Sequence, residues 1–476
     1  MAKRVLIIGA GEAGRMILQE ITQHPESGFE VAGFLDDEPS LKGRKVDGIP
    51  VLGQCADLVE VVRTIPVDEA IISVPSAERE FIRRIISLCR DAGLNYKIVP
   101  GLIEIIRGPA RLDQIREVHP EDLLGRETVE FDEKAISEAL AGRSVLVTGA
   151  GGSIGGEICR QVGRFDLEAL LLLGRGENQI YDIEYEMRTR HPNIKTEALI
   201  ADIRDEIGLR HLFERVRPQY VFHAAAHKHV HYMEAFPEEA VKNNVFGTAN
   251  IINVCRESGV ERLVMLSTDK AVEPEGVMGA TKRLAEYLMA NGARQAGGAR
   301  LMTVRFGNVL GSRGSVVPLF IDQIRKGGPV TVSSPEASRF FMTLKEACML
   351  VIQASILGKG GEIFILQMGQ PIKIMEIAKD LIALHGLRPN IDVEVELIGL
   401  RPGEKLHESL LARAEAIEDS PHEYILTTRA TIPDGLDIDE VLGKLKGMTD
   451  RGDGEAIKHL LNEIIPDACL PVREKR

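Results

Sequence analysis

The chain has 476 residues, which is room for two or three folded units that each bury a core of their own. Hydrophobic residues make up 44% of it and charged residues 27%, so the composition is that of a globular protein and argues against a disordered, fibrous or disulfide-scaffold chain. The formal net charge of -13 disfavours a general nucleic-acid or anionic-membrane surface, and any phosphate must therefore be bound locally.

Cysteine spacing and apolar run length bear on where the chain works. The six cysteines are scattered without paired spacing, which favours a reduced cytosolic setting. The apolar run 5–8 is too short for a signal peptide, and no stretch approaches the roughly 18 apolar residues of a membrane-spanning helix. We therefore expect a soluble, cytoplasmic protein.

The N-terminal third alternates strand and helix signals. Strands are predicted near 5–8, 29–34 and 70–74, and helices near 12–23, 56–64 and 77–92. This alternation predicts a parallel sheet. Gly9, Gly11 and Gly14 follow the first strand, and Asp36 follows the second, so these four residues are candidates for a nucleotide site. The alternative is a unit that only packs or regulates.

Between about 100 and 140 the pattern weakens at Arg107-Gly108-Pro109, before a short helix at 133–140. We predict an N-terminal Rossmann-like domain at 1–106 and a linker with a connecting helix at 107–140. A larger domain would cover 141–476, with a smaller lobe at about 312–415 and a C-terminal tail.

The larger domain repeats the strand and helix alternation more fully. Strands are predicted near 145–147, 170–173, 197–200, 220–223, 263–266 and 302–305, and helices near 154–164, 177–190, 207–215, 238–257 and 280–292. Six parallel strands fit a complete dinucleotide-binding fold. Beyond 315 we expect helices near 344–357 and 374–386, strands near 362–366 and 393–398, and a partly helical tail at 410–476. The fold class is α/β, with two Rossmann-like doubly wound sheets.

A second glycine motif, Gly149-x-x-Gly152-x-x-Gly155, opens this domain and includes Ser153 and Ile154. Its glycines allow a tight turn and let the backbone approach a pyrophosphate at the helix N-terminus. Asp202 and Ile203 follow the third strand, where the aspartate could accept a hydrogen bond from an adenine amine. These residues predict a dinucleotide cofactor.

The second strand of this domain ends in Leu173-Gly174-Arg175, where an NAD enzyme usually has an acid, and Gly174 removes that acid. An arginine there could bind a 2′-phosphate, so we favour NADP and keep NAD as the alternative. Ala224, Ala225 and Ala226 would line the nicotinamide side, and Lys228 is a candidate substrate ligand. The histidines around them suggest a metal, but no carboxylate or thiol completes a site, so we expect none.

Ser267-Thr268-Asp269-Lys270 lies at the predicted end of the fifth strand, the usual place for ligand-facing groups. Lys282 follows. Short-chain dehydrogenase/reductase enzymes normally carry a proton-transferring tyrosine four residues before such a lysine, and here that residue is Met278. Because a thioether exchanges no proton, the site is either degenerate or uses its neighbours instead.

Three arginine-containing segments follow: 305–314, 339–343 and 401–405. Guanidinium groups match phosphate oxygens, so separate arginines in an acidic chain suggest a diphosphate clamp.

Together the segments 148–155, 267–272, 278–283, 305–309 and 401–405 resemble the UDP-N-acetylglucosamine 4,6-dehydratases of the capsular-polysaccharide biosynthesis family, which are extended short-chain dehydrogenase/reductases. The resemblance covers about residues 125–415, and residues 1–106 resemble the extra domain of long members. Such members commonly begin with transmembrane helices. This chain has none, so it would be membrane-associated only if an anchor is missing from it.

The resemblance implies a redox-neutral elimination from a UDP-sugar, in which hydride leaves C4, water is lost across C5 and C6, and hydride returns to C6. Lys270 would take the C5 proton, Asp269 would protonate the leaving 6-hydroxyl, and Thr268 would hold the 4-hydroxyl. Burial beside Lys282 would lower the pKa of Lys270, although its attraction to Asp269 opposes this. Lys282 would bind the nicotinamide ribose.

The remaining implied roles concern the substrate. Asn308, Arg339 and Arg401 would grip the diphosphate, and Glu404 would lie near the uridine ribose. Met278 matches long family members, and the 4-hydroxyl proton would go to Asp269, Lys270 or a water. Two alternatives stay open: an epimerase of the same fold and a catalytically inactive nucleotide sensor. A homo-oligomer is the default for such folds.

Overall fold

The computed structural model describes residues 2–74, 77, 79–99, 115–124, 129, 131–295, 297–420 and 422–472. The chain divides into two compact units. The first comprises Met1–Val129, Leu319–Thr331 and Glu376–Glu396, and the second comprises Glu130–Pro318, Val332–Met375 and Leu397–Arg476. The predicted domain limits stay predictions, because Arg107-Gly108-Pro109 and much of the linker lie outside the described residues.

The first unit contains a six-stranded sheet in the order β3-β4-β2-β1-β5-β6. All neighbouring strands in it run parallel except the antiparallel pair β3 and β4. The strands are β1 (Lys3–Ile8), β2 (Phe29–Leu35), β3 (Lys45–Val46), β4 (Ile49–Gly53), β5 (Glu69–Ile72) and β6 (Asn95–Ile98). Its helices include α1 (Glu12–Gln23), α2 (Leu58–Thr64) and α3 (Arg79–Asp91). The sequence pattern missed β3, β4 and β6, which are short.

Both faces of this sheet are buried, because successive side chains of β1 point to opposite sides. Val5 and Ile7 pack with residues of α1, whereas Leu6 and Ile8 pack with residues of α2 and α3. A continuous apolar strand covered by helices on both sides is what a doubly wound fold requires.

The second unit contains an eight-stranded sheet in the order β20-β17-β12-β11-β10-β7-β8-β9. The six predicted strands are β7 (Ser144–Thr148), β8 (Ala169–Gly174), β9 (Lys195–Ile200), β10 (Tyr220–His223), β11 (Arg262–Thr268) and β12 (Arg300–Phe306). The predicted strand β17 (Glu362–Leu366) extends them in parallel. The edge strand β20 (Ile425–Arg429) is antiparallel and was not expected, because the tail was predicted as partly helical.

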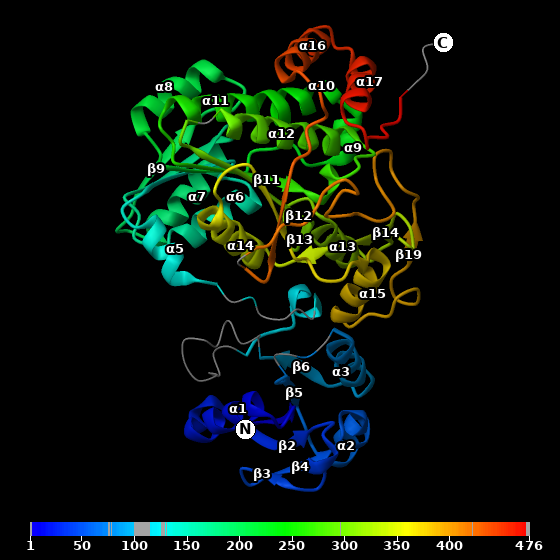
Figure 1. Ribbon diagram of the computed structural model, residues 1–476. Helices are drawn as coiled ribbons and strands as arrows, with labels where there is room; N and C mark the ends of the chain where they lie inside the picture. Colours follow the sequence, from blue (N-terminus) through cyan, green and yellow to red (C-terminus); the bar gives the residue numbers. More distant parts are fainter. Residues whose placement is uncertain are drawn as a thin grey trace. The chain divides into compact units, whose positions relative to one another are not determined.

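Helices cover both faces of this second sheet (Figure 1). One layer contains α5 (Glu133–Leu140), α6 (Ser153–Val162), α7 (Glu177–Arg190) and α14 (Leu344–Leu357). The other contains α8 (Glu206–Val216), α11 (Gly247–Glu257) and α12 (Val277–Arg294), and the tail helices α16 (Ile438–Asp450) and α17 (Gly454–Ile464) share its core. The doubly wound prediction is therefore confirmed for this unit.

The helix predicted near 238–257 is present as a continuous helical run but includes a π-helical turn. It consists of α10 (Pro237–Ala240), a π-helical turn at Val241–Phe246 and α11. Such π turns occur often at functional sites, because they re-aim side chains without breaking the helix. A further helix, α9 (Val230–Ala235), precedes α10.

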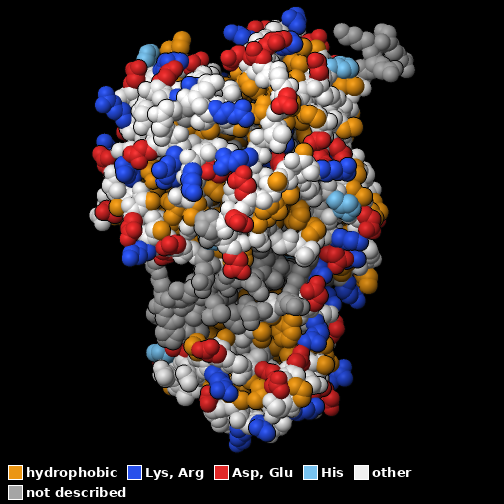
Figure 2. Space-filling model, in the orientation of Figure 1, with side chains coloured by type: hydrophobic (Ala, Val, Ile, Leu, Met, Phe, Trp, Pro, Cys, Tyr) orange, Lys and Arg blue, Asp and Glu red, His pale blue; other side chains and the backbone are white. Residues whose placement is uncertain are grey.

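Short elements follow β12. The strands are β13 (Asn308–Val309), β14 (Val330–Val332), β15 (Ser338–Arg339), β16 (Phe341–Met342), β18 (Ile372–Lys373) and β19 (Val395–Leu397), and the helices are α13 (Val316–Arg325) and α15 (Ile374–Leu384). No helix in the described part of the chain is long and apolar enough to cross a membrane. On the face shown in Figure 2, acidic and basic side chains are interspersed rather than gathered by sign.

Candidate functional site

The second glycine loop joins β7 to α6 and has a backbone that larger residues could not adopt. Gly149 has φ 67°, and a Cβ on it would lie 2.9 Å from the backbone of Ala225. A Cβ on Gly155 would lie 2.3 Å from the carbonyl oxygen of Gly149. The loop therefore needs these glycines, and it brings the start of α6 against the segment after β10.

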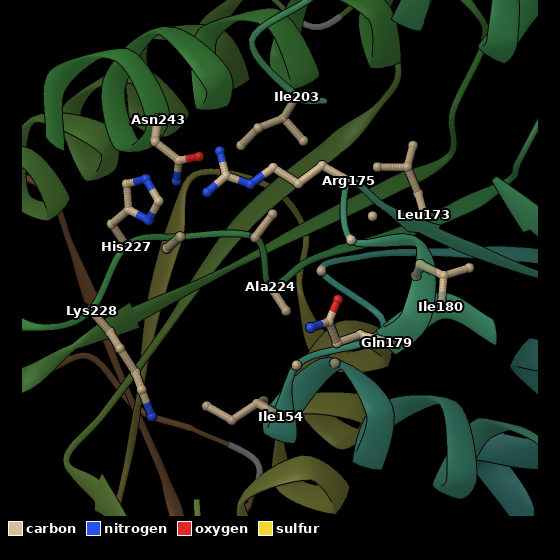
Figure 3. Close-up of a pocket in the computed structure, with 18 of the residues that line it drawn as sticks. Ile154, Leu173, Arg175, Gln179, Ile180, Ile203, Ala224, His227, Lys228 and Asn243 are labelled. Atoms are coloured by element: carbon tan, nitrogen blue, oxygen red, sulfur yellow. The ribbon is translucent and has the colours of Figure 1, made fainter. Parts of the chain in front are cut away.

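A cavity of about 480 Å³ opens on this loop. It is lined by every predicted cofactor residue except Lys282, and also by Lys228. Further lining residues that the sequence reasoning did not assign include Gln179, Asn243 and Arg313. Figure 3 shows Ile154 and Lys228 near one another and Leu173 and Ile180 at the other side of the cavity, with Ala224 between.

Arg175 extends from the end of β8 across this cavity toward Asn243 (Figure 3). About half of its side chain is exposed, and its Nη1 lies 3.9 Å from Asp202 Oδ2. The carboxylate of Asp202 is already engaged, because Arg204 donates to both of its oxygens. The hydrogen bonds and charge of Arg204 lower the pKa of Asp202. Asp202 is thus an ionised acceptor at the cavity wall.

The loop after β10 is held by a buried asparagine of the π turn. Asn244 accepts a hydrogen bond from the backbone N–H of His227 and donates to the carbonyl of His227 and to Thr281 Oγ1. His223, at the end of β10, bonds to the hydroxyls of Thr148 and Thr248. Burial and the charge of Lys282 lower the pKa of His223 to about 3, so this imidazole is neutral. It is a structural group.

Lys282 and Met278 lie on α12 and are both buried. Burial lowers the pKa of Lys282 to about 8, and Glu286 only partly offsets this. Met278 belongs to the hydrophobic core cluster of the second unit. α12 approaches the turn after β11 so closely that a Cβ on Gly279 would lie 2.1 Å from the carbonyl oxygen of Lys270.

Thr268, Asp269 and Lys270 form the end of β11 and the turn after it. Asp269 is fully buried, and its Oδ1 accepts hydrogen bonds from Lys270 Nζ at 2.9 Å and Thr268 Oγ1 at 2.9 Å. Its other oxygen, Oδ2, has no hydrogen-bond partner among the described residues. A buried carboxylate oxygen left open is costly in a folded protein and marks a place for an incoming donor.

The pKa of Lys270 runs opposite to the expectation from burial. Burial alone would lower it, but the charges of Asp269 and Glu408 outweigh burial, and the pKa is raised. The sequence left the balance between burial and the attraction to Asp269 open, and the attraction dominates in the free protein, because two carboxylates lie within 4 Å of the ammonium group.

The predicted diphosphate residues occupy different places. Asn308 accepts a hydrogen bond of 3.1 Å from Lys270 and so lies beside Asp269 and Lys270. Arg339 is buried and donates to the carbonyls of Ser338, Lys405 and Leu406. Arg401 is exposed, and its backbone N–H donates to Glu404. Their contacts with a diphosphate stay predictions.

Glu408 is the acid that sequence reasoning missed. Its side chain is almost completely buried, and its carboxylate lies 3.8 Å from Lys270 Nζ, 3.9 Å from Arg339 Nε and 3.8 Å from Lys405 Nζ. The available signal was its position, three residues beyond the Arg401–Lys405 motif. Only the fold shows that this loop returns to the end of β11.

In the first unit the glycine loop has the same tight geometry. Gly9 has φ 100°, a Cβ on Gly14 would lie 2.0 Å from the carbonyl oxygen of Gly9, and Gly11 faces open space. Asp36 accepts hydrogen bonds from the backbone of Ala10 and Glu38, which ties the end of β2 to the loop. A nucleotide at this site stays a prediction.

The described residues contain no cluster of three or more histidine, cysteine, aspartate or glutamate side chains able to hold a metal ion. Of the cysteines, five are buried and Cys469 is exposed, and all six are free.

Comparison with known families matches most of the chain. Residues 145–430 match the family described as "Polysaccharide biosynthesis protein", and residues 2–100 match the family described as "CoA-binding domain".

Individual relatives agree with these matches. The capsular polysaccharide biosynthesis protein CapD of Staphylococcus aureus is 41% identical over 425 residues, which are 89% of this chain and 71% of the relative. A UDP-glucose 4-epimerase of Rickettsia rickettsii is 36% identical over 59% of this chain and 82% of its own length. The crystal structure of Pen from Bacillus thuringiensis is 35% identical with a TM-score of 0.57, and the match covers 63% of this chain and 89% of that protein.

Proposed function

We propose that this chain, which belongs to the polysaccharide biosynthesis protein family, is a UDP-N-acetylglucosamine 4,6-dehydratase. The observation that carries the proposal is the pair of the buried Asp269 and the partly buried Lys270 at the carboxyl end of β11, with one aspartate oxygen left open. An acid and a base that touch each other suit the removal of a proton and a hydroxyl from neighbouring carbons.

A nicotinamide cofactor fits the cavity next to this pair. The glycine loop offers a backbone with no Cβ in the way, and Arg175, Lys228 and Arg313 supply positive charge for phosphates. When bound, the cofactor supplies reversible hydride transfer, so the reaction needs no external oxidant. We assign Lys282 to the nicotinamide ribose. We favour NADP because Gly174 stands where the usual acid would end β8 and the adjacent Arg175 could bind a 2′-phosphate.

In the resting pair Lys270 is an ammonium and Asp269 is a carboxylate, and the reaction needs both side chains in their neutral forms. Lys270 must be a neutral amine to take the C5 proton, and Asp269 must be an acid to protonate the leaving 6-hydroxyl. Moving one proton along their 2.9 Å hydrogen bond produces both states at once, with no exchange with solvent. After elimination Lys270 holds the C5 proton and Asp269 is ionised. When hydride returns to C6, Lys270 gives a proton back to C5, and the proton released from the 4-hydroxyl then restores the resting pair.

Substrate binding would favour the neutral pair. A sugar that covers the site removes water, and two opposite charges out of water are stabilised less than their neutral forms. Thr268, which donates to Asp269 Oδ1, would also hold the sugar 4-hydroxyl. Met278 is packed in the core and has no ionisable group, so the 4-hydroxyl proton would pass to Asp269, Lys270 or a water.

Mass spectrometry of the product tests the reaction class. Incubation of the pure protein with UDP-N-acetylglucosamine should give a 4-keto product one water lighter, without added reductant. An epimerase, the second candidate because of the similarity to a UDP-glucose 4-epimerase, would give a product of unchanged mass.

Two variants test the assignment against a catalytically inactive nucleotide sensor. Asp269→Asn and Lys270→Ala should each lower turnover by about 10²–10⁴-fold while cofactor binding persists. If both variants keep the parental turnover, this pair does not carry the reaction.

A further inference from the structure

The loop 401–408 is held by hydrogen bonds at the three residues directly before one buried acid, Glu408. Arg339 donates hydrogen bonds to the carbonyls of Lys405 and Leu406. The hydroxyl of Ser338 and Nδ1 of His407 share a hydrogen bond of 2.8 Å. Lys405 Nζ donates to the carbonyl of Val272 at 2.6 Å, in the segment directly after the catalytic turn. These bonds fix the backbone that carries Glu408, so its carboxylate has a defined place.

The carboxylate of Glu408 lies among three cations without a hydrogen bond of standard length to any of them. Lys270, Arg339 and Lys405 are each 3.8–3.9 Å from it. Its Oε2 is buried and has no hydrogen-bond partner among the described residues. A group held at these distances acts on its neighbours mainly through charge, and in a site with little water that influence is strong.

The groups facing Lys270 therefore come from four segments. Asp269 and Glu408 carry negative charge, Arg339 carries positive charge, and Asn308 is a neutral acceptor. Asp269 is one partner in the proposed proton exchange, so its charge changes during the reaction. Glu408 is the second carboxylate, and it makes no direct hydrogen bond to Lys270.

We propose that Glu408 is a positioning residue that keeps Lys270 in its ammonium form, hydrogen-bonded to Asp269, until substrate is bound. This inference rests on the proposed role of Lys270 as the base. It links the loop predicted to bind the nucleotide to the charge state of the catalytic lysine, because the same segment carries Glu404, Lys405 and Glu408.

The test compares Glu408→Gln, which removes the charge at nearly constant volume, with Glu408→Asp, which keeps the charge on a shorter side chain. Acetic anhydride reacts only with neutral amines, so trace labelling followed by peptide mass spectrometry reports the neutral fraction of each lysine. Lys270 is reachable because 21% of its side chain is exposed. Lys134, with 86% of its side chain exposed, is the internal reference.

At constant pH near neutrality, Glu408→Gln should raise the labelling of Lys270 relative to Lys134 by about tenfold, the size typical of losing one opposite charge within 4–6 Å. Glu408→Asp should stay closer to the parent. Glu418→Gln removes an exposed carboxylate paired with Arg429 and is the matched control that should change nothing. Equal labelling of Lys270 in the parent and in a folded Glu408→Gln protein would overturn the inference.

Kinetics separate this inference from the proposed function. If Lys270 is the base, the pair is active while it holds one proton, so the fall of kcat/KM at high pH, where that proton is lost, should move to lower pH in Glu408→Gln and stay in place in Glu418→Gln. Labelling that changes in a protein without dehydratase turnover would support the role of Glu408 and contradict the proposed function. Turnover with unchanged labelling would support the function and contradict the role of Glu408.

Discussion

Ser267 donates a hydrogen bond of 2.7 Å to Glu286, and this bond ties the strand that carries Thr268 and Asp269 to a buried set of four charges. Arg283 and Arg305 each pair with both Glu286 and Glu415 at 2.6–3.0 Å. The network joins β11, α12, β12 and the segment at 415, so it ties the strand that ends at Thr268 to three other parts of the second unit.

The first prediction concerns this network. Glu415→Gln should lower the free energy of unfolding by about 3–5 kcal/mol at pH 7, because it leaves Arg305 and Arg283 buried with too few partners. Urea unfolding would measure the loss. Glu418→Gln, in an exposed pair, should change stability by no more than about 1 kcal/mol.

The same variant should show a defined pH dependence. Burial alone would raise the pKa of Glu415, but Arg305 and Arg283 outweigh it and lower the pKa to about 2. A depressed carboxyl pKa stabilises the fold above its unfolded value of 4.5, and the stabilisation is lost as pH falls from there toward 2. The difference between parent and Glu415→Gln should therefore shrink over this range. A constant difference would contradict the assignment.

A second prediction concerns Lys282, whose pKa is lowered from 10.5 to about 8 by burial. A charged Lys282 costs the fold stability below about pH 8, and this cost disappears as pH rises from 8 to 10.5. Lys282→Met should thus raise the free energy of unfolding at pH 7, by up to about 3 kcal/mol, and weaken cofactor binding. Lys242→Met, which removes a half-exposed lysine, is the control and should have little effect. A Lys282→Met protein less stable than the parent at pH 7 would contradict the prediction.

A third prediction concerns the choice of cofactor. Arg175→Ala should weaken NADP binding by about tenfold or more, the worth of a charge-assisted hydrogen bond, and leave NAD binding nearly unchanged. Calorimetric titration of both dinucleotides measures this. Arg190→Ala, on the exposed end of α7, should alter neither. If Arg175→Ala weakened the binding of NADP and of NAD equally, Arg175 would not be the residue that binds the 2′-phosphate.

A fourth prediction concerns the residue that stands where a tyrosine is usual. Met278→Leu should keep turnover within about twofold and change stability by less than about 1.5 kcal/mol, because Met278 packs in the hydrophobic core. Met278→Tyr should leave the pH dependence of turnover unchanged. A new ionisation in its pH profile would show that the side chain at 278 reaches the proton path.

The sequence was sufficient to predict the parallel core of both sheets. Apolar strands such as 145–147 and 220–223 carry their own pattern, and glycines at 149 and 155 are needed for close backbone approach. The antiparallel strand β20 escaped prediction because an edge strand is stabilised by its neighbour, β17, rather than by its own pattern. The π-helical turn at 241–246 was also not predicted, because no local sequence pattern marks it. Its residue Asn244 bonds to His227 and Thr281, which lie elsewhere along the chain.

In the site, too, the residues marked by a local sequence pattern were predicted, and the residue brought in by the fold was not. Asp269 and Lys270 were found because they follow a strand, where ligand-facing groups usually lie. Glu408 was not found, because a loop far along the chain returns to Lys270 only in the folded structure. Asp269 raises the pKa of Lys270 most and lies in the local motif, whereas the further contribution of Glu408 is contained in no local motif.

The most direct measurement of the central claim uses UDP-N-acetylglucosamine labelled with deuterium at C4. A 4,6-dehydratase should give a product one water lighter than its substrate, with the deuterium at C6 by NMR and no net change in the cofactor. A product of unchanged mass, or deuterium lost to solvent during turnover, would contradict the proposed function.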